Sequence, residues 1–151
     1  AAGTTPSMLL DDGGQIIAES AAVSGGNITL DLTGSLLLRN GSLISATAGI
    51  AEAGGNGGNI FVDTGFIFAV PQENSDIRAD AFEGNGGRVR ISANGVFGIE
   101  FRENITPYSD ITASSQQGNS GIVNINTPHI ASEKAPTYLI LSSPRYFSTS
   151  V

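Results

Sequence analysis

A seven-residue segment that recurs at nearly constant spacing constrains the fold of this chain more than any other feature. It reads GGNITLD from Gly25, GGNIFVD from Gly57 and GGRVRIS from Gly86, and it returns more loosely as SGIVNIN from Ser120. The steps between these starts are 32, 29 and 34 residues. Such a period is typical of solenoids, in which each repeat is one supersecondary unit that stacks on the next.

Each repeat carries two further β-prone stretches after the first. The second stretch follows Gly34, Gly65 and Gly95 and covers residues 36–38, 67–70 and 97–101. The third stretch covers residues 42–46, 75–79 and 109–113, and Ile16 with Ala18 is a remnant of an earlier copy. Three strands per repeat, joined by glycine-rich turns, are what one rung of a three-sided coil requires. The sequence therefore predicts an all-β fold, a right-handed single-stranded parallel β-helix with three-strand rungs and about four rungs.

Alternation within the strands predicts which side chains form the core, because residues two apart point to the same side of a strand. The predicted core is Ile28, Leu30, Ile60, Val62, Val89, Ile91, Val123 and Ile125, with Ile44, Ile77 and Ile111 from the third stretch. The predicted outward columns are Thr29, Phe61, Arg90, Asn124 and Asp31, Asp63, Ser92, Asn126. Asn27 and Asn59 are expected to stack in turns with Gly57, Gly58, Gly86 and Gly87, where glycine accepts a positive φ.

The repeat divides the chain into three parts. Residues 1–13 are a partial lead-in, residues 14–128 are β-helix repeats (about 25–56, 57–85, 86–119 and 120–128), and residues 129–151 are an atypical tail. Four rungs would expose apolar stacks and unpaired backbone at both ends, so we expect a capping strand at 138–141 or end-to-end self-association. An antiparallel sandwich or barrel is the alternative fold, but it does not explain why the same residue types recur in every third strand.

Composition excludes several classes of partner. A net charge of −7 with only seven Lys and Arg residues argues against nucleic acid and anionic membranes. The absence of cysteine excludes a disulfide framework and thiolate metal sites. No apolar run approaches the ~20 residues that span a bilayer, so no membrane span is predicted. Residues 1–7 lack the features of a signal peptide, so an exported protein would carry this chain as a fragment.

Several carboxylates are candidates for catalysis by a β-helix polysaccharide lyase or hydrolase. They are Glu100, Glu103 and Asp110 in one rung, and Asp76 with Asp80 in another. The interpretation we favour is a solvated strand face, in which Glu100 alternates with inward Ile99 and Phe101. The chain has one histidine, His129, and it lies in the tail, away from the acids. We therefore predict no enzyme activity and no catalytic residue.

Three further features receive a structural interpretation. The glycine-rich run 54–59 faintly resembles calcium-binding nonapeptide repeats, but Asn59 and Arg88 occupy the place of the expected carboxylate, so neither metal nor cofactor is predicted. Glycosylation sequons begin at Asn27, Asn40 and Asn104, and such short motifs often arise by chance. A basic patch for an anionic glycan would consist of Arg78, Arg88, Arg90 and Arg102, and the preferred interpretation is mixed pairing with nearby acids.

Two runs of the sequence resemble a known family. They are GGNIFVDTGFIFAVPQENSDIRADAFEGNGGRVRISANGVFGIEFRE from Gly57 to Glu103 and the segment Ile105–Ser115, which contains SDITASS. Both resemble filamentous haemagglutinin-like exoproteins, and the resemblance covers roughly residues 14–128, as the C-terminal part of the β-helical repeat region. It implies a protein of the two-partner secretion type that leaves the cell through an outer-membrane two-partner transporter and is secreted or held at the bacterial cell surface.

The role that this resemblance implies is structural and adhesive. The partners would be surface glycans or other cells, and nucleic acid would not be among them. The alternative is a carbohydrate-binding or carbohydrate-cleaving β-helix protein.

Overall fold

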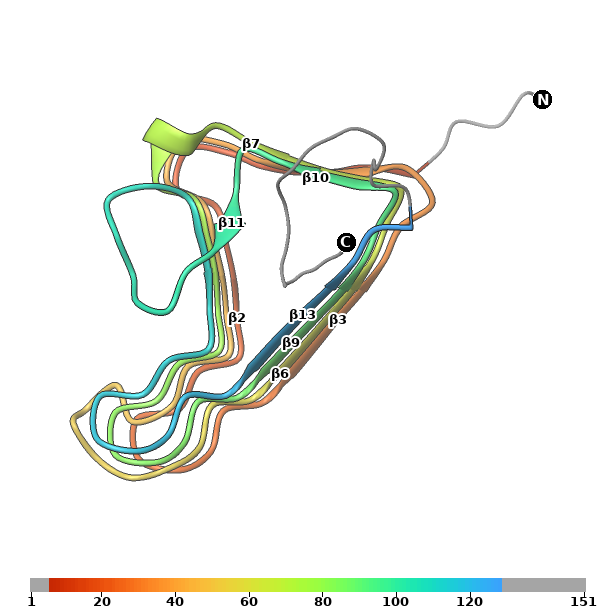
Figure 1. Ribbon diagram of the computed structural model, residues 1–151. Helices are drawn as coiled ribbons and strands as arrows, with labels where there is room; N and C mark the ends of the chain where they lie inside the picture. Colours follow the sequence, from red (N-terminus) through yellow and green to blue (C-terminus); the bar gives the residue numbers. More distant parts are fainter. Residues whose placement is uncertain (1–5, 129–151) are drawn as a thin grey trace.

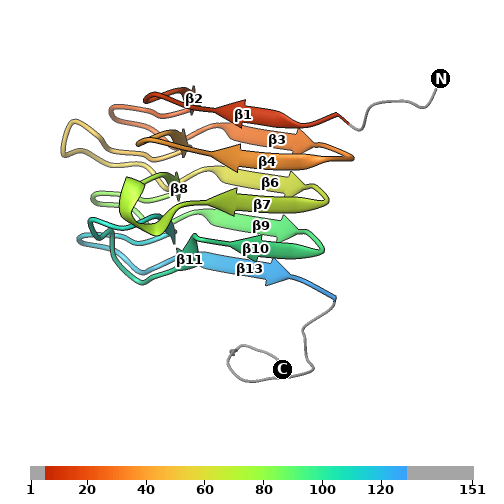
Figure 2. The same cartoon turned by 90° about the horizontal axis from the view of Figure 1, so that it is seen from above.

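The computed structural model describes residues 6–128, which form a parallel β-solenoid with three sheets as its three sides (Figure 1). The chain runs anticlockwise in Figure 1 while its turns advance towards the viewer, as the side view in Figure 2 shows, so the solenoid is right-handed. Every strand pair is parallel, and each sheet takes one strand from successive turns. The predicted fold class is thereby confirmed, and the antiparallel alternative is wrong.

We name each sheet after one of its strands. The β3 sheet contains β3 (Asn27–Asp31), β6 (Asn59–Asp63), β9 (Arg88–Ser92) and β13 (Ile122–Asn126). The β4 sheet contains β1 (Met8–Leu10), β4 (Ser35–Leu38), β7 (Phe66–Ala69) and β10 (Gly95–Phe97). The β5 sheet contains β2 (Gln15–Ile17), β5 (Leu43–Ser45), β8 (Asp76–Arg78), β12 (Asp110–Thr112) and β11 (Glu100–Phe101). A single 3-10 turn, η1 (Pro71–Glu73), is the one helical element among the described residues.

The core consists of apolar columns that run along the solenoid axis. In the β3 sheet the column is Ile28, Ile60, Val89 and Val123, paired in exact order from turn to turn. Most of the residues proposed for the core are buried: Ile28, Ile60, Val62, Val89, Ile91, Ile44, Ile77 and Ile111. Leu30, Val123 and Ile125 are half-buried, because they lie in the first or last strand of the sheet and are covered from one side only.

Backbone hydrogen bonds close the corner between the β5 and β3 sheets, and we call this narrow contact the pinch. The backbone N–H of Gly58 donates to Ala46 O at 2.8 Å, and Gly87 N–H donates to Ala79 O at 2.7 Å. Beyond the pinch, loops 19–24, 47–56, 80–85 and 114–119 stack into a protruding lobe, visible at the lower left of Figure 1. The lobe has its own parallel bridges, from Ser20 through Ala48 and Ala81 to Ser115.

The glycines of this pinch are required by close packing. A Cβ atom on Gly57, Gly58, Gly86 or Gly87 would overlap a backbone oxygen of the adjacent turn or of the facing alanine. None of the four has a left-handed φ, so the expectation that a positive φ selects them is wrong. In the glycine-rich run 54–59, the residue with a left-handed backbone conformation is Gly55, with φ 115°.

The second stretch of the third repeat differs from its prediction. Residues 97–101 do not form one strand, because Gly98 with φ 80° turns the chain between β10 and β11. Gly95 pairs with Phe66, one position away from the predicted equivalence with Gly65. Ile99 is buried as predicted, and Phe101 is the register partner of inward-facing Ile111, as its inward assignment requires. Phe101 is nevertheless 49% exposed, because β11 is the last strand of its sheet.

Both ends of the solenoid contain strands that the repeat does not reveal. β1 lies inside residues 1–13 and pairs with β4, so the lead-in already belongs to the solenoid. β11 precedes β12 in the chain but pairs with it on the side where the next turn would add a strand. It therefore covers the C-terminal edge of the β5 sheet. The tail, including the predicted capping strand 138–141, lies outside the described residues.

Candidate functional site

The outer face of the β5 sheet is polar yet largely buried. Glu100, Asp110 and Asp76 follow one another on β11, β12 and β8, and Asp80 lies just beyond β8. The loop 102–109, which we call the strap, lies outside this sheet on one side, and the lobe lies on the other (Figure 1). These two features shield Asp110, Asp76 and Asp80 from water, while Glu100 stays exposed.

Asp110 holds the strap in place. Its side chain is fully buried and accepts hydrogen bonds from Arg102 Nη1, from the Thr106 backbone N–H at 2.6 Å and from Thr106 Oγ1 at 2.8 Å. Arg102 also pairs with Glu100 at 3.4 Å, and its guanidinium lies 5.7 Å from the centre of the Tyr108 ring. These hydrogen bonds satisfy a buried carboxylate and fix the loop over the sheet.

Asp80 connects the lobe to the sheet in the same way. Its carboxylate accepts from Arg78 Nε at 2.8 Å, Thr112 Oγ1 at 3.0 Å and the Ser114 backbone N–H at 2.7 Å. The last two donors belong to the next turn, so the side chain ties adjacent turns together.

Serines form a parallel ladder at the start of the β5 sheet. The N–H of Ser42 donates to Ser75 Oγ, and that of Ser75 donates to Ser109 Oγ at 2.9 Å. Ser109 Oγ in turn donates to Val70 O at 2.9 Å. The hydroxyls of Ser75 and Ser109 thus link one turn to the next, whereas Ser42 Oγ is buried without a hydrogen-bond partner among the described residues.

Burial changes the ionisation of the Asp76 side chain. Its Oδ1 accepts the Asp110 N–H at 2.9 Å, but burial and, less strongly, the charge of Asp110 raise the pKa of Asp76 to about 6. The Asp110 N–H and Arg78 act in the opposite direction without offsetting the burial. Asp76 is therefore the acid in this face whose charge costs the folded state free energy near neutral pH.

Replacing Asp76 by asparagine is expected to remove a pH dependence of stability. Because its folded pKa exceeds the unfolded value, the native state binds more protons between about pH 4 and 6, and the free energy of unfolding falls as pH rises through that window. The loss should be about 2–3 kcal/mol by pH 7. Urea unfolding at pH 4 and pH 7 should show Asp76→Asn equal to the wild type at the lower pH and more stable at the higher.

Asp63→Asn is the matched control, because Asp63 is exposed on the β3 sheet. The Arg39–Glu73 ion pair holds the pKa of Glu73 down at about 2, mainly by hydrogen bonding. Its contribution is lost only as pH falls below about 4.5, and it is common to all three proteins, so it cancels in the comparison. Equal pH profiles for Asp76→Asn and the wild type would show that Asp76 is not a buried acid.

The candidate acids therefore separate into two groups. Glu100 and Glu103 are exposed, as a solvated strand face requires. The interpretation as a solvated strand face does not hold for Asp76, Asp80 and Asp110. These three are buried among hydrogen-bond donors, because the strap and the lobe cover them. Repeat alignment of one sequence could not reveal this cover.

The asparagines form ladders at the turns. Asn59 Nδ2 donates to Asn27 Oδ1 at 2.9 Å, so the two residues proposed to stack do lie together. In the lobe, the Asn85 N–H donates to Asn56 Oδ1 at 2.8 Å, and the Asn119 N–H donates to Asn85 Oδ1 at 3.0 Å. No group of three or more His, Cys, Asp or Glu side chains within residues 6–128 is placed to hold a metal ion.

The four arginines of the proposed basic patch lie on two different faces. Arg78 and Arg102 lie on the β5 sheet and pair with Asp80 and Asp110. Arg88 and Arg90 are exposed on β9, in the β3 sheet. The four therefore do not form one patch, and mixed pairing describes the first two.

The outer face of the β4 sheet carries an apolar column that the sequence analysis missed. Leu9, Leu37, Phe68 and Phe97 are register partners on β1, β4, β7 and β10. The Phe68 and Phe97 rings stack at 5.5 Å between centroids, and Phe66 stacks on Phe68 at 5.8 Å. Leu9 is 58% exposed, and Phe68 and Phe97 are 40% and 51% exposed. The available signal was the alternation Phe66-Ile67-Phe68, which has apolar residues on both faces of one strand.

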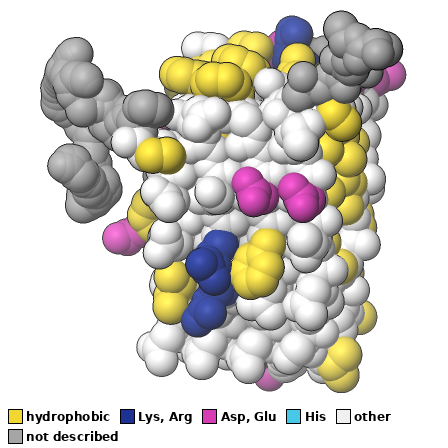
Figure 3. Space-filling view, turned by 90° about the vertical axis from the view of Figure 1, so that its right-hand side faces the viewer, with side chains coloured by type: hydrophobic (Ala, Val, Ile, Leu, Met, Phe, Trp, Pro, Cys, Tyr) yellow, Lys and Arg dark blue, Asp and Glu magenta, His cyan; other side chains and the backbone are white. Residues whose placement is uncertain are grey.

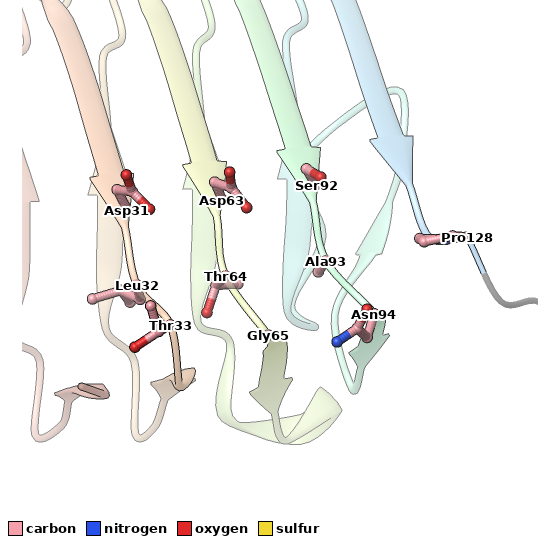
Figure 4. A pocket seen from close by; sticks show the side chains of 10 residues that line it. All are labelled: Asp31, Leu32, Thr33, Asp63, Thr64, Gly65, Ser92, Ala93, Asn94 and Pro128. Atoms are coloured by element: carbon pink, nitrogen blue, oxygen red, sulfur yellow. The ribbon is translucent and has the colours of Figure 1, made fainter. Parts of the chain in front are cut away.

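A shallow groove follows the corner between the β3 and β4 sheets (Figure 4). Its wall repeats from turn to turn, with Asp31, Asp63 and Ser92 on one side and Thr33, Thr64 and Asn94 further along the chain. The groove is open, its lining is about equally polar and apolar, and no titratable group in it has a hydrogen-bond partner of the kind seen at Asp110. It offers hydrogen-bonding groups without a catalytic arrangement.

Among residues 6–128, no helix has the length and apolar character that crossing a bilayer would need. No protein-family model, no curated protein and no solved structure matches the chain.

Proposed function

We propose that this chain is a structural and adhesive segment of a filamentous haemagglutinin-like exoprotein, secreted or held at the bacterial cell surface after export through a two-partner transporter. The solenoid supplies a stiff spacer, because each turn is tied to the next by strand pairing and by polar side-chain ladders. Its outward side chains supply contacts with surface glycans or other cells. The sequence resemblance supports the exoprotein origin, and the outer surface supports adhesion.

The observation that carries the adhesive role is the apolar column Leu9–Leu37–Phe68–Phe97, together with Phe66. Large apolar side chains are normally withdrawn from water, and contiguous exposed ones mark interaction surfaces. This column is held rigid by sheet register and ring stacking, so little side-chain entropy is lost when a partner binds.

The bonding of the acids disfavours the alternative of carbohydrate cleavage. A general acid or nucleophile must reach its substrate, but Asp110 is fully buried and bonded to Arg102 and Thr106. Asp76 has the raised pKa of a general acid, yet it is only 8% exposed. The hydrogen bonds of Asp110 hold the strap, and the hydrogen bond of Asp76 links two turns, so both residues have a structural role.

Replacing Phe68 and Phe97 by serine should reduce adhesion at least tenfold. Loss of two exposed aromatic contacts costs on the order of 1–2 kcal/mol each in a typical interface. The measurement is retention of the fluorescently labelled chain on beads that carry neutral or uronate polysaccharides, and on intact cells. Fold is checked by circular dichroism, because both side chains point away from the core.

Val23→Ser with Ile50→Ser is the matched control, since both residues are exposed and apolar but lie in the lobe. Equal retention of wild type, control and the double phenylalanine variant would overturn the adhesive role of the β4 face. Release of sugar fragments by the wild type, abolished in Asp76→Asn, would instead establish the cleaving alternative.

A further inference from the structure

The β3 sheet presents a regular outward array distinct from the β4 face. Three columns run along the axis, each with one residue from β3, β6, β9 and β13 in register. The columns are Asn27, Asn59, Arg88, Ile122; Thr29, Phe61, Arg90, Asn124; and Asp31, Asp63, Ser92, Asn126. All twelve side chains are exposed.

The charges on this array are separated by sign. Asp31 and Asp63 occupy adjacent strands in the last column, while Arg88 and Arg90 lie together on β9. Figure 3 shows this face with its acidic and basic side chains in separate clusters. No salt bridge found among residues 6–128 includes any of these four residues, although the other three described arginines all have carboxylate partners.

Phe61 lies between the two clusters. Along its own strand Asp63 is two residues away, and across the sheet Arg90 is its register partner, with the guanidinium 5.5 Å from the ring centre. Asp31 and Asp63 therefore lie towards one corner of the array and Arg88 and Arg90 towards the opposite corner, with the exposed Phe61 ring between the two pairs. Phe61 is 40% exposed, so the contact with Arg90 leaves much of the ring uncovered.

This arrangement is complementary to itself. A two-fold axis in the plane of the face, passing beside Phe61, exchanges the position of Asp63 with that of Arg90. The strand spacing and the two-residue repeat along each strand then bring Asp31 opposite Arg88 of the second copy. The two Phe61 rings meet near the axis. An isologous interface of this kind repeats each contact twice, giving four ion pairs around an aromatic centre.

We propose that the β3 sheet is a lateral docking surface for a second copy of this chain, face to face, with Asp31 and Asp63 of each copy paired with Arg88 and Arg90 of the other. Three columns on four strands cover about 400 Å² per copy, half of what a standard stable interface buries. The contact is therefore weak for one segment and depends on salt, because its charges are solvent-exposed.

The test is sedimentation equilibrium of the full chain at about millimolar concentration in low and high salt. The wild type should associate at low salt and dissociate in high salt. The variants Arg88→Glu with Arg90→Glu and Asp31→Lys with Asp63→Lys should each lose self-association at least tenfold, since each makes the face a single sign. An equimolar mixture of the two variants should associate about as tightly as the wild type, because the mixed pair restores four contacts between opposite charges.

The remaining outcomes would overturn the proposal. They are a wild type that stays monomeric at low salt, variants that associate as the wild type does, or a mixture that stays monomeric. Loss of association in Phe68→Ser with Phe97→Ser, with the charge variants unaffected, would place the contact on the β4 face. A monomeric wild type that binds a polyuronate through Arg88 and Arg90 would identify an anionic glycan as the partner of this surface. Circular dichroism checks that each variant is folded.

Discussion

Replacing Ile60 by aspartate is expected to unfold the solenoid. Ile60 is completely buried in the middle of the apolar column that runs from Ile28 to Val123, with no polar group positioned to receive a carboxylate. Burying an unpartnered carboxylate costs several kcal/mol, which is on the order of the total stability of a domain this size. Far-ultraviolet circular dichroism of the variant at 25 °C should show loss of the β signal.

Asp63→Ala, three residues along the same strand, is the control for this substitution. Its side chain points outward and makes no hydrogen bond with residues 6–128, so its removal should change the free energy of unfolding by less than about 0.5 kcal/mol. A folded Ile60→Asp protein combined with an unfolded Asp63→Ala protein would reverse the inward and outward assignment of the whole strand.

Gly58→Ala is expected to have an effect of similar size for a different reason. The new Cβ would overlap Gly26 O of the turn before, and the surrounding atoms are backbone on both sides of the pinch. Backbone that is already paired between turns cannot move aside without breaking the bond from Gly58 N–H to Ala46 O. Overpacking of this kind costs about 3 kcal/mol or more, and urea unfolding should show it as a lowered midpoint.

Gly54→Ala provides a matched glycine in the same run. Its φ is ordinary for any residue, and a Cβ there would meet only Glu83 Oε1 at 3.6 Å. Removing backbone freedom from the unfolded chain should leave this variant as stable as the wild type or up to about 1 kcal/mol more stable. If both alanine variants unfolded at the same urea concentration, close packing at the pinch would not be the reason for Gly58.

The stacking of the β3 sheet was predictable from sequence because each strand carries its own marker. The Gly-Gly pairs at Gly25, Gly57 and Gly86 begin each copy at the same point, and the residues that follow alternate between apolar and polar, with outward Phe61 as the exception. Register in a sheet with one buried face is set by this alternation, since a slip of one residue would turn the whole core outward. The same argument identified Ile44, Ile77 and Ile111.

The β4 sheet was harder to align because its marker is ambiguous. Gly95 resembles Gly65 in sequence but occupies the position of Phe66, and the ring of Phe97 lies over it. Met8–Leu10 carries no glycine marker of its own, so the repeat pattern predicts a lead-in where β1 forms. Apolar alternation failed here for a physical reason, because both faces of β7 are apolar.

The buried acids and the strap could not be predicted from the repeat at all. Whether an outward residue meets water depends on loops that differ between copies, and the segment 98–109 occurs in one copy only. β11 precedes β12 in the chain, yet it pairs with β12 on the side where the repeat would place the strand of the following turn. Asp110 binds the strap, and Asp76 binds the backbone of Asp110, so the roles of both acids depend on this irregular segment.

All of these proposals depend on parallel stacking, and paired cysteines test it directly because the chain has no cysteine of its own. Register partners on adjacent strands lie about 4.8 Å apart, within the range that a disulfide can bridge. Oxidation of Asp31→Cys with Asp63→Cys should therefore give an intramolecular disulfide, detected by loss of free thiols. Asn27→Cys with Asp63→Cys should keep both thiols free, because these positions lie at opposite ends of paired strands. A disulfide between positions 27 and 63, with none between 31 and 63, would mean antiparallel strands and contradict the solenoid.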